Sequence, residues 1–97
     1  MGKLINAAIQ VLPKTKQNND YEVVDKAITV IQNTGLKYRV CPFETVVEGE
    51  YEQITTLISE IQEACFTGGA ESMLINIKLQ VSKDTDVYID DKMIKYD

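Results

Sequence analysis

The feature that most constrains the fold is the segment 35–50, which reads as two strands joined by a tight corner. Polar and apolar residues alternate over 37–41, Pro42 then interrupts any strand ladder, and 44–50 resumes with a β-branched run. A glycine lies at each end, one after an apolar pattern of helical spacing and one before another. The segment therefore predicts a hairpin with a Pro-Phe-Glu corner, set between two helices.

Strands are also predicted on both sides of this helix–hairpin–helix unit. Residues 4–12 alternate as a strand with one apolar face that ends at Pro13, and 14–19 form a polar loop. Residues 72–82 alternate in the same way and form the longest predicted strand. In the tail, 87–89 fit a continuing strand and 90–96 fit a short terminal helix.

Two amphipathic helices complete the pattern. The first is predicted to have Asp20 as its N-cap and to end at 33–35. Its apolar positions are Val24, Ala27, Ile28 and Ile31. The second covers 51–66 and closes at Gly68-Gly69, a typical C-cap pair. Its apolar positions are Ile54, Leu57, Ile58, Ile61, Ala64 and Cys65.

The element order predicts an α+β fold, the ferredoxin-like split βαββαβ sandwich, as one domain over 1–97. Both helices should cover one face of a four-stranded antiparallel sheet, with Ile9 and Ile77 beneath them and a short helix at the C-terminus. The second and fourth strands should form the sheet edges, which favours a homo-oligomer, either dimer or tetramer. The other sheet face should be polar, and it is either solvated or a ligand or partner surface. The residues expected on it are Asn6, Ala8, Gln10, Asn76, Lys78 and Gln80.

Charge and composition exclude several classes of function. A net charge of −5 and a pI near 4.6 argue against binding to nucleic acid or to an anionic membrane. The sequence starts with no signal-peptide pattern and has no apolar run long enough to cross a membrane, so a cytoplasmic location is expected. Cys41 and Cys65 form no C-x-x-C pair and are interpreted as reduced thiols.

Catalytic chemistry has little support in the sequence. The chain contains no histidine, so neither a Ser-His nor a Cys-His pair is available, and no glycine-rich phosphate loop is present. Cys41 therefore fits a small buried hydrophobe better than a nucleophile. Four aspartates at 84, 86, 90 and 91 match no calcium loop and are better explained as caps or solvated charges. We expect neither an enzyme, a metal site nor a cofactor.

The hairpin is the best candidate for a binding site. It brings together Tyr38, Thr45 and Glu48, which offer a stacking ring, a hydroxyl and a carboxylate. These groups suit a flat, nitrogen-rich heterocycle with an exocyclic amine. The ordinary alternative is that Thr45 is a good strand residue and Glu48 a solvated charge at a strand end.

The sequence resembles the small YkoF-like thiamine-binding proteins with a ferredoxin-like fold. The resemblance extends over V-L-P at 11–13, G-L-K-Y at 35–38, P-x-x-T-x-x-E-G at 42–49 and D-K-x-x-K-Y at 91–96. It implies a non-catalytic protein that binds thiamine, or its hydroxymethylpyrimidine half, near a subunit interface. It also implies dimers that pair into tetramers.

Carried onto this chain, the motif threonine is Thr45 and the motif glutamate is Glu48, with Tyr38 in the preceding strand. These two polar residues would anchor the ligand, and Tyr38 or Phe43 would form the aromatic wall. Strand alternation adds three polar residues to the predicted site. They are Gln10, Asn76 and Lys78.

Two classes of function therefore remain open. The first is a small-molecule binding protein for thiamine or a related pyrimidine. The second is a structural or regulatory homo-oligomeric interaction protein without a small ligand. Only the first predicts that a ligand stabilises the fold.

Overall fold

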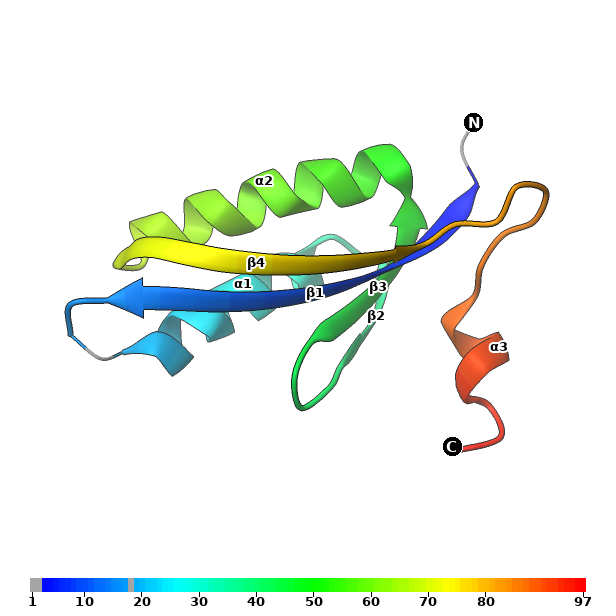
Figure 1. Ribbon diagram of the computed structural model, residues 1–97, viewed down its shortest axis with the longest axis horizontal. Coiled ribbons are helices and arrows are strands. Elements are labelled where there is room, and N and C mark those ends of the chain that lie inside the picture. The colour runs from blue at the N-terminus through cyan, green and yellow to red at the C-terminus, as the bar shows by residue number, and fades with distance from the viewer. Residues whose placement is uncertain (1–2, 18) are drawn as a thin grey trace.

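The computed structural model describes residues 3–17 and 19–97 and contains a four-stranded antiparallel sheet with strand order β2-β3-β1-β4. In chain order the elements are β1 (Leu4–Thr15), α1 (Asp20–Asn33), β2 (Lys37–Val40), β3 (Thr45–Glu50), α2 (Tyr51–Thr67), β4 (Ala70–Gln80) and α3 (Ile89–Met93). This is the ferredoxin-like arrangement predicted from the sequence, with β2 and β4 at the edges. Figure 1 shows α2 running along one side of β4 and β1, while the short α3 is set apart from both long helices.

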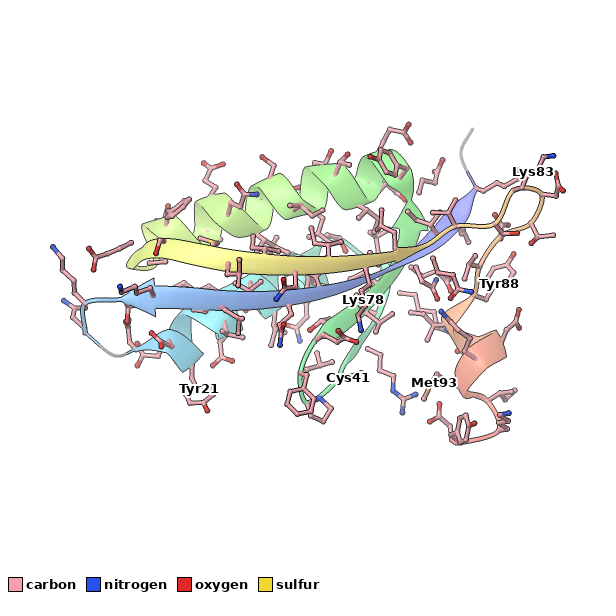
Figure 2. All side chains as sticks on the ribbon, viewed as in Figure 1. Tyr21, Cys41, Lys78, Lys83, Tyr88 and Met93 are labelled. Atoms are coloured by element: carbon pink, nitrogen blue, oxygen red, sulfur yellow. The ribbon has the colours of Figure 1, made fainter. Side chains whose placement is uncertain are left out.

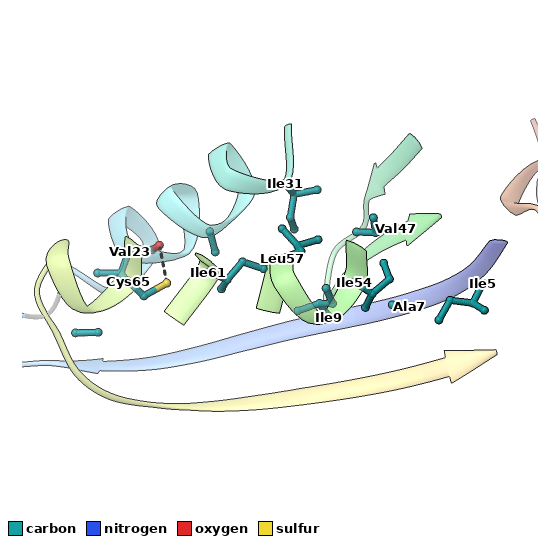
Figure 3. Packing of buried hydrophobic residues seen from close by; sticks show 12 residues of the cluster. Ile5, Ala7, Ile9, Val23, Ile31, Val47, Ile54, Leu57, Ile61 and Cys65 are labelled. Atoms are coloured by element: carbon teal, nitrogen blue, oxygen red, sulfur yellow. Dashed lines mark hydrogen bonds between the residues drawn. The ribbon is translucent and has the colours of Figure 1, made fainter. Parts of the chain in front are cut away.

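The core lies between the two long helices and one face of the sheet. Leu57 and Ile61 of α2 are fully buried and pack with Val47 of β3 and Ile9 of β1 (Figure 3). The other buried members are Ile5, Ala7, Val23, Ala27, Ile31, Ile54, Cys65 and Ala70. Burial of these side chains is the main stabilising term, because each removes apolar surface from water.

The first turn of the first helix differs from its prediction. Its N-cap is Asn19, and the residue of α1 that enters the core is Val23 rather than Val24. Both valines are apolar, so the helical period alone does not decide which one faces the sheet. Ala27 and Ile31 are buried as predicted.

The prediction that the first strand ends at Pro13 is wrong. β1 continues to Thr15, and Pro13 pairs with Met73 of β4. β3 pairs with β1 only as far as Ile9, so Pro13 lies where β1 has a single neighbour. A proline is tolerated there because no second strand needs a hydrogen bond from its missing N–H.

β4 has the predicted phase but is less buried than expected. Ile77 pairs with Ile9, so its side chain lies on the helix side of the sheet, yet it is 37% exposed. Leu79 is 46% exposed. The strand is also shifted, to 70–80 instead of 72–82. The long helices therefore leave the outer edge of β4 uncovered.

The C-terminal segment forms no further strand. The Val87 N–H donates to the Leu4 carbonyl at 3.0 Å, and the Leu4 N–H donates to Asp86 Oδ1 at 2.7 Å. The segment then turns into α3, which is shorter than the predicted helix at 90–96. Within the described residues, no helix has the length and apolar character needed to cross a membrane.

Candidate functional site

A hollow of about 240 Å³ lies on the sheet face opposite the long helices. The strand register explains it: Ala8 of β1 has Val46 of β3 on one side and Lys78 of β4 on the other. In the next row, Asn6 lies between Glu48 and Gln80. Directly paired residues share a face, so the single methyl group of Ala8 leaves a depression among longer side chains.

Asn6 is the buried polar residue of this hollow. Its side chain is only 3% exposed, and its Nδ2 donates to the Val87 carbonyl at 2.9 Å. That bond fixes the orientation of the amide, because a carbonyl requires a donor. Asn6 Oδ1 is buried and has no hydrogen-bond partner among the described residues. An acceptor in this state lacks a donor that a ligand or a water molecule would supply.

Charged and amide groups surround the rest of the hollow. The Lys78 ammonium lies 3.3 Å from Glu44 Oε1, and Lys92 of α3 donates to Gln80 Oε1 at 2.6 Å. Figure 2 shows Lys78 on the side of the sheet away from α2. Two ammonium groups and one carboxylate therefore line a small hollow on a chain whose net charge is negative.

The C-terminal segment forms one wall of the hollow and is held by side chains of the hairpin. Glu48 Oε1 accepts the Ile89 N–H at 2.8 Å, and Lys37 donates to Asp90 Oδ2 at 2.5 Å. The hydrogen bond to Asp90 raises the pKa of Lys37. Further along, Arg39 donates two hydrogen bonds to the Asp97 carboxylate, at 2.7 and 2.9 Å. These bonds lower the pKa of Asp97.

The predicted site residues do not all meet in the structure. Thr45 pairs with Ile9 and is 6% exposed on the helix side, whereas Glu48 pairs with Asn6 on the opposite face. Because side chains alternate along a strand, two residues three apart cannot share a face. The expectation that Thr45 and Glu48 converge on one ligand is therefore not met within this chain.

The aromatic candidates accompany Thr45 and not Glu48. Tyr38 pairs with Val47 and is 37% exposed, while Phe43 at the corner is 81% exposed. Phe43 and Thr45 line a narrow hollow of about 100 Å³ beside Ile28 of α1. Its lining is mostly apolar, and it is too small for a substituted ring.

The three residues added from strand alternation lie on the same sheet face as the hollow at Ala8. Lys78 lines it, and Asn76 next to it donates to Gln10 Oε1 at 3.0 Å across the β1–β4 pair. Gln10 and Asn76 therefore hydrogen-bond to each other, and they lie one row beyond Ala8 in the strand register. Alternation thus predicted correctly that these three residues share the sheet face opposite the long helices.

Lys78 is the one lining residue of this hollow that was in the predicted site, and three of the polar residues that were missed are Asn6, Glu44 and Lys92. Asn6 was expected on this face, but its burial depends on the Val87 carbonyl, which no sequence period indicates. Glu44 was counted only as part of the corner, and Lys92 only as part of the tail motif. Lys92 lies outside the predicted strands, so nothing in the sequence indicated that it contacts Gln80.

Another, larger hollow of about 490 Å³ lies between the end of α1 and the start of α2. Most of its lining is exposed, including Glu52, Gln53 and Glu60. It is a wide groove with no unpartnered buried polar atom among its lining residues. It offers less to fix the orientation of a ligand than the hollow at Ala8 does.

The lining of the hollow at Ala8 combines apolar, amide and charged groups. Ala8 and Val46 provide an apolar floor, and Asn6, whose buried Oδ1 has no partner among the described residues, also lines the hollow. The opposite charges of Glu44 and Lys78 lie at its rim. An apolar floor with a few polar groups is typical of small-molecule sites.

The chain is similar to known proteins in sequence and in fold. Residues 7–97 match the family model described as "Thiamine-binding protein". A UPF0045 protein from Clostridium perfringens is 36% identical over 91 residues, covering 94% of this chain and 95% of that protein.

Two solved structures are similar over almost their whole length. One is a domain of unknown function, DUF77, from Bacillus cereus, with a TM-score of 0.94, 37% identity and coverage of 100% of this chain and 93% of that one. The other is a candidate thiamine biosynthesis/salvage protein from Thermotoga maritima, with a TM-score of 0.87 and 30% identity. It covers 97% of this chain and 99% of that one.

Proposed function

This chain belongs to the thiamine-binding protein family, and on that premise we propose that it binds thiamine or its hydroxymethylpyrimidine moiety without catalysing a reaction. The observation that carries the proposal is the unpartnered Oδ1 of Asn6, buried in the lining of the hollow beside Ala8. The aminopyrimidine ring has an exocyclic amine, and this amine would donate to Asn6 Oδ1 while the ring lies on Ala8 and Val46.

The size of the hollow favours the pyrimidine half. Pockets for drug-sized ligands are roughly 300–1,000 Å³, and this one is about 240 Å³. A single substituted ring fits that volume better than two linked rings. In thiamine, the thiazolium ring would extend past the rim, which carries the Glu44 carboxylate and the Lys78 ammonium.

The rim of the hollow lies at the edge of the sheet, which connects binding with assembly. Lys78 and Gln80 belong to the edge strand β4. The same strand exposes apolar side chains that the long helices do not cover, among them Leu74 at 60% and Ile77 at 37%. We propose that a second copy covers this edge in a homodimer or homotetramer and so borders the ligand.

A homo-oligomeric protein with no ligand is the second candidate function. The uncovered apolar edge of β4 favours it, because assembly alone would explain that edge. It leaves the buried acceptor of Asn6 without a role. The two functions are separated by whether a pyrimidine stabilises the folded protein.

Thermal unfolding with thiamine, hydroxymethylpyrimidine and a thiazole-only compound tests the proposal. A ligand at a hundredfold excess over Kd stabilises the native state by about 2.7 kcal/mol. For a chain of this size that is a shift of several degrees or more in Tm. We expect both pyrimidine-containing compounds to raise the Tm and the thiazole to have little effect.

A variant that fills the hollow provides the matched control. Ala8→Leu should abolish the shift, because the added atoms occupy the place of the ring. Ser72→Leu adds an apolar side chain on the far part of β4 and should leave the shift intact. If no pyrimidine raises the Tm of the unmodified protein at millimolar concentration, the assembly function is left as the better explanation.

A further inference from the structure

The two lysines of the hollow have no role in holding an uncharged pyrimidine. The ring needs an apolar floor and an acceptor, which Ala8, Val46 and Asn6 already supply. Lys78 and Lys92 come from different elements, yet both line the same small hollow. With Glu44 as the one carboxylate among its lining residues, the hollow has a net positive charge on a chain whose total is −5.

Neither lysine is held in a strong ion pair. Lys78 faces Glu44 at 3.3 Å, but its side chain is 76% exposed, and an exposed pair of this kind is readily exchanged for another anion. The partner of Lys92 is the neutral amide of Gln80, at 2.6 Å. Gln80 lies two residues from Lys78 on the same face, about 7 Å along the strand. Both lysines thus line the hollow with their ammonium groups in exchangeable contacts.

We infer that the preferred ligand of this hollow is a pyrimidine carrying a phosphate monoester, with the phosphate bound between Lys78 and Lys92. This inference rests on the proposed function and specifies its ligand class. A phosphate monoester carries about −1.5 to −2 charges near neutral pH and three acceptor oxygens. Lysine is a common partner for such a group.

The geometry gives the ligand one orientation. Asn6 is a buried lining residue of the hollow, whereas Lys78 is largely exposed at its rim. The ring would therefore enter first and the phosphate would remain at the surface. Because the phosphate loses its second negative charge below a pH of about 6, the preference for the ester should weaken there.

Calorimetric titration compares three probes: hydroxymethylpyrimidine, its phosphate ester and inorganic phosphate. At low salt we expect the ester to bind about tenfold more tightly than the free alcohol, the effect of one charge-assisted hydrogen bond. Lys78→Gln and Lys92→Gln should each lower the affinity for the ester more than the affinity for the alcohol and so remove most of this advantage. Both lysines are exposed, so the variants should fold.

Lys14→Gln is the matched control. It removes the same charge from the same face of β1, about 20 Å from Ala8. Equal affinity for ester and alcohol would overturn the inference and leave the proposed function standing. Equal affinity for ester and inorganic phosphate, or an equal loss in Lys14→Gln, would also overturn it. If neither pyrimidine binds, the proposed function fails and the inference fails with it.

Discussion

The carboxylate of Glu48 accepts the backbone N–H of Ile89 at 2.8 Å and so fixes the start of α3 to the middle strand β3. Forty-one residues separate the two, and the contact lies on the sheet face that the long helices leave open. The motif glutamate therefore has a structural task. It positions the segment whose Val87 carbonyl binds Asn6 and whose Lys92 borders the hollow.

Removal of the Glu48 acceptor should loosen the C-terminal segment. Glu48→Ala is expected to lower the free energy of unfolding by about 1.5 kcal/mol, the scale of a hydrogen bond to a charged group. Glu48→Gln keeps a carbonyl oxygen in reach of the Ile89 N–H and should lose less. Urea unfolding measures the difference, and amide exchange over 86–94 should accelerate only in the alanine variant. Equal stability of the two variants would contradict this role.

Leu57 and Ile77 were both predicted to face the core, but they differ in their exposed fraction. Leu57→Ala should lower the free energy of unfolding by about 2–5 kcal/mol, because Leu57 is 0% exposed and its removal leaves a cavity. Ile77→Ala should cost less than about 2 kcal/mol, since its side chain is 37% exposed. Denaturant unfolding compares them. If Ile77 were fully covered by the helices, as the sequence pattern predicted, Ile77→Asp would unfold the domain. Its exposure of 37% instead predicts that this variant remains folded.

Much of the fold could be predicted because the apolar residues follow two regular spacings, that of a strand and that of a helix. The alternation around Ile9 and Ile77 gave the correct face for both, and the helical spacing of Leu57 and Ile61 gave the buried side of α2. These patterns report which side of an element is apolar. They do not report how far a helix extends over a strand, which is why the exposure of Ile77 was missed.

The site was less predictable because it depends on contacts between distant segments. Thr45 and Glu48 are close in sequence, but the strict alternation of β3 places them on opposite faces. Asn6 and Lys92 are far apart in sequence, but the Val87 and Gln80 contacts bring both to one hollow. A motif gives spacing along the chain, whereas a site requires proximity across the sheet.

The attachment of the last residues should depend on pH. Arg39 holds the pKa of the Asp97 carboxyl below its ordinary value of 3.8. A carboxyl with a lowered folded-state pKa stabilises the attached state above its ordinary pKa, and this contribution is lost as the pH falls through the lowered value. The protection of amides near the C-terminus, taken relative to an unfolded chain at the same pH, should therefore fall below a pH of about 3.8.

Asp97→Asn is the control for this effect, because it keeps the size of the side chain but does not titrate. Its terminal segment should already be less protected at neutral pH, and this protection should change little on acidification. Added salt should reduce the difference between the two proteins, since the pair is exposed. An identical pH profile for both would show that the Arg39–Asp97 pair does not hold the segment.

Assembly through β4 should depend on the apolar side chains at its uncovered edge. Ile77 and Leu74 lie on opposite faces of this strand and are both exposed, so a second copy added along the edge would cover apolar surface on both sides. Ile77→Lys places a charge in that contact and should produce a monomer that retains its secondary structure. Light scattering coupled to gel filtration measures the mass of both proteins at micromolar concentration. Thr29→Lys, on the exposed side of α1, is a control and should leave the oligomer intact. A monomeric unmodified protein, or an Ile77→Lys variant with unchanged mass, would exclude this edge as the interface.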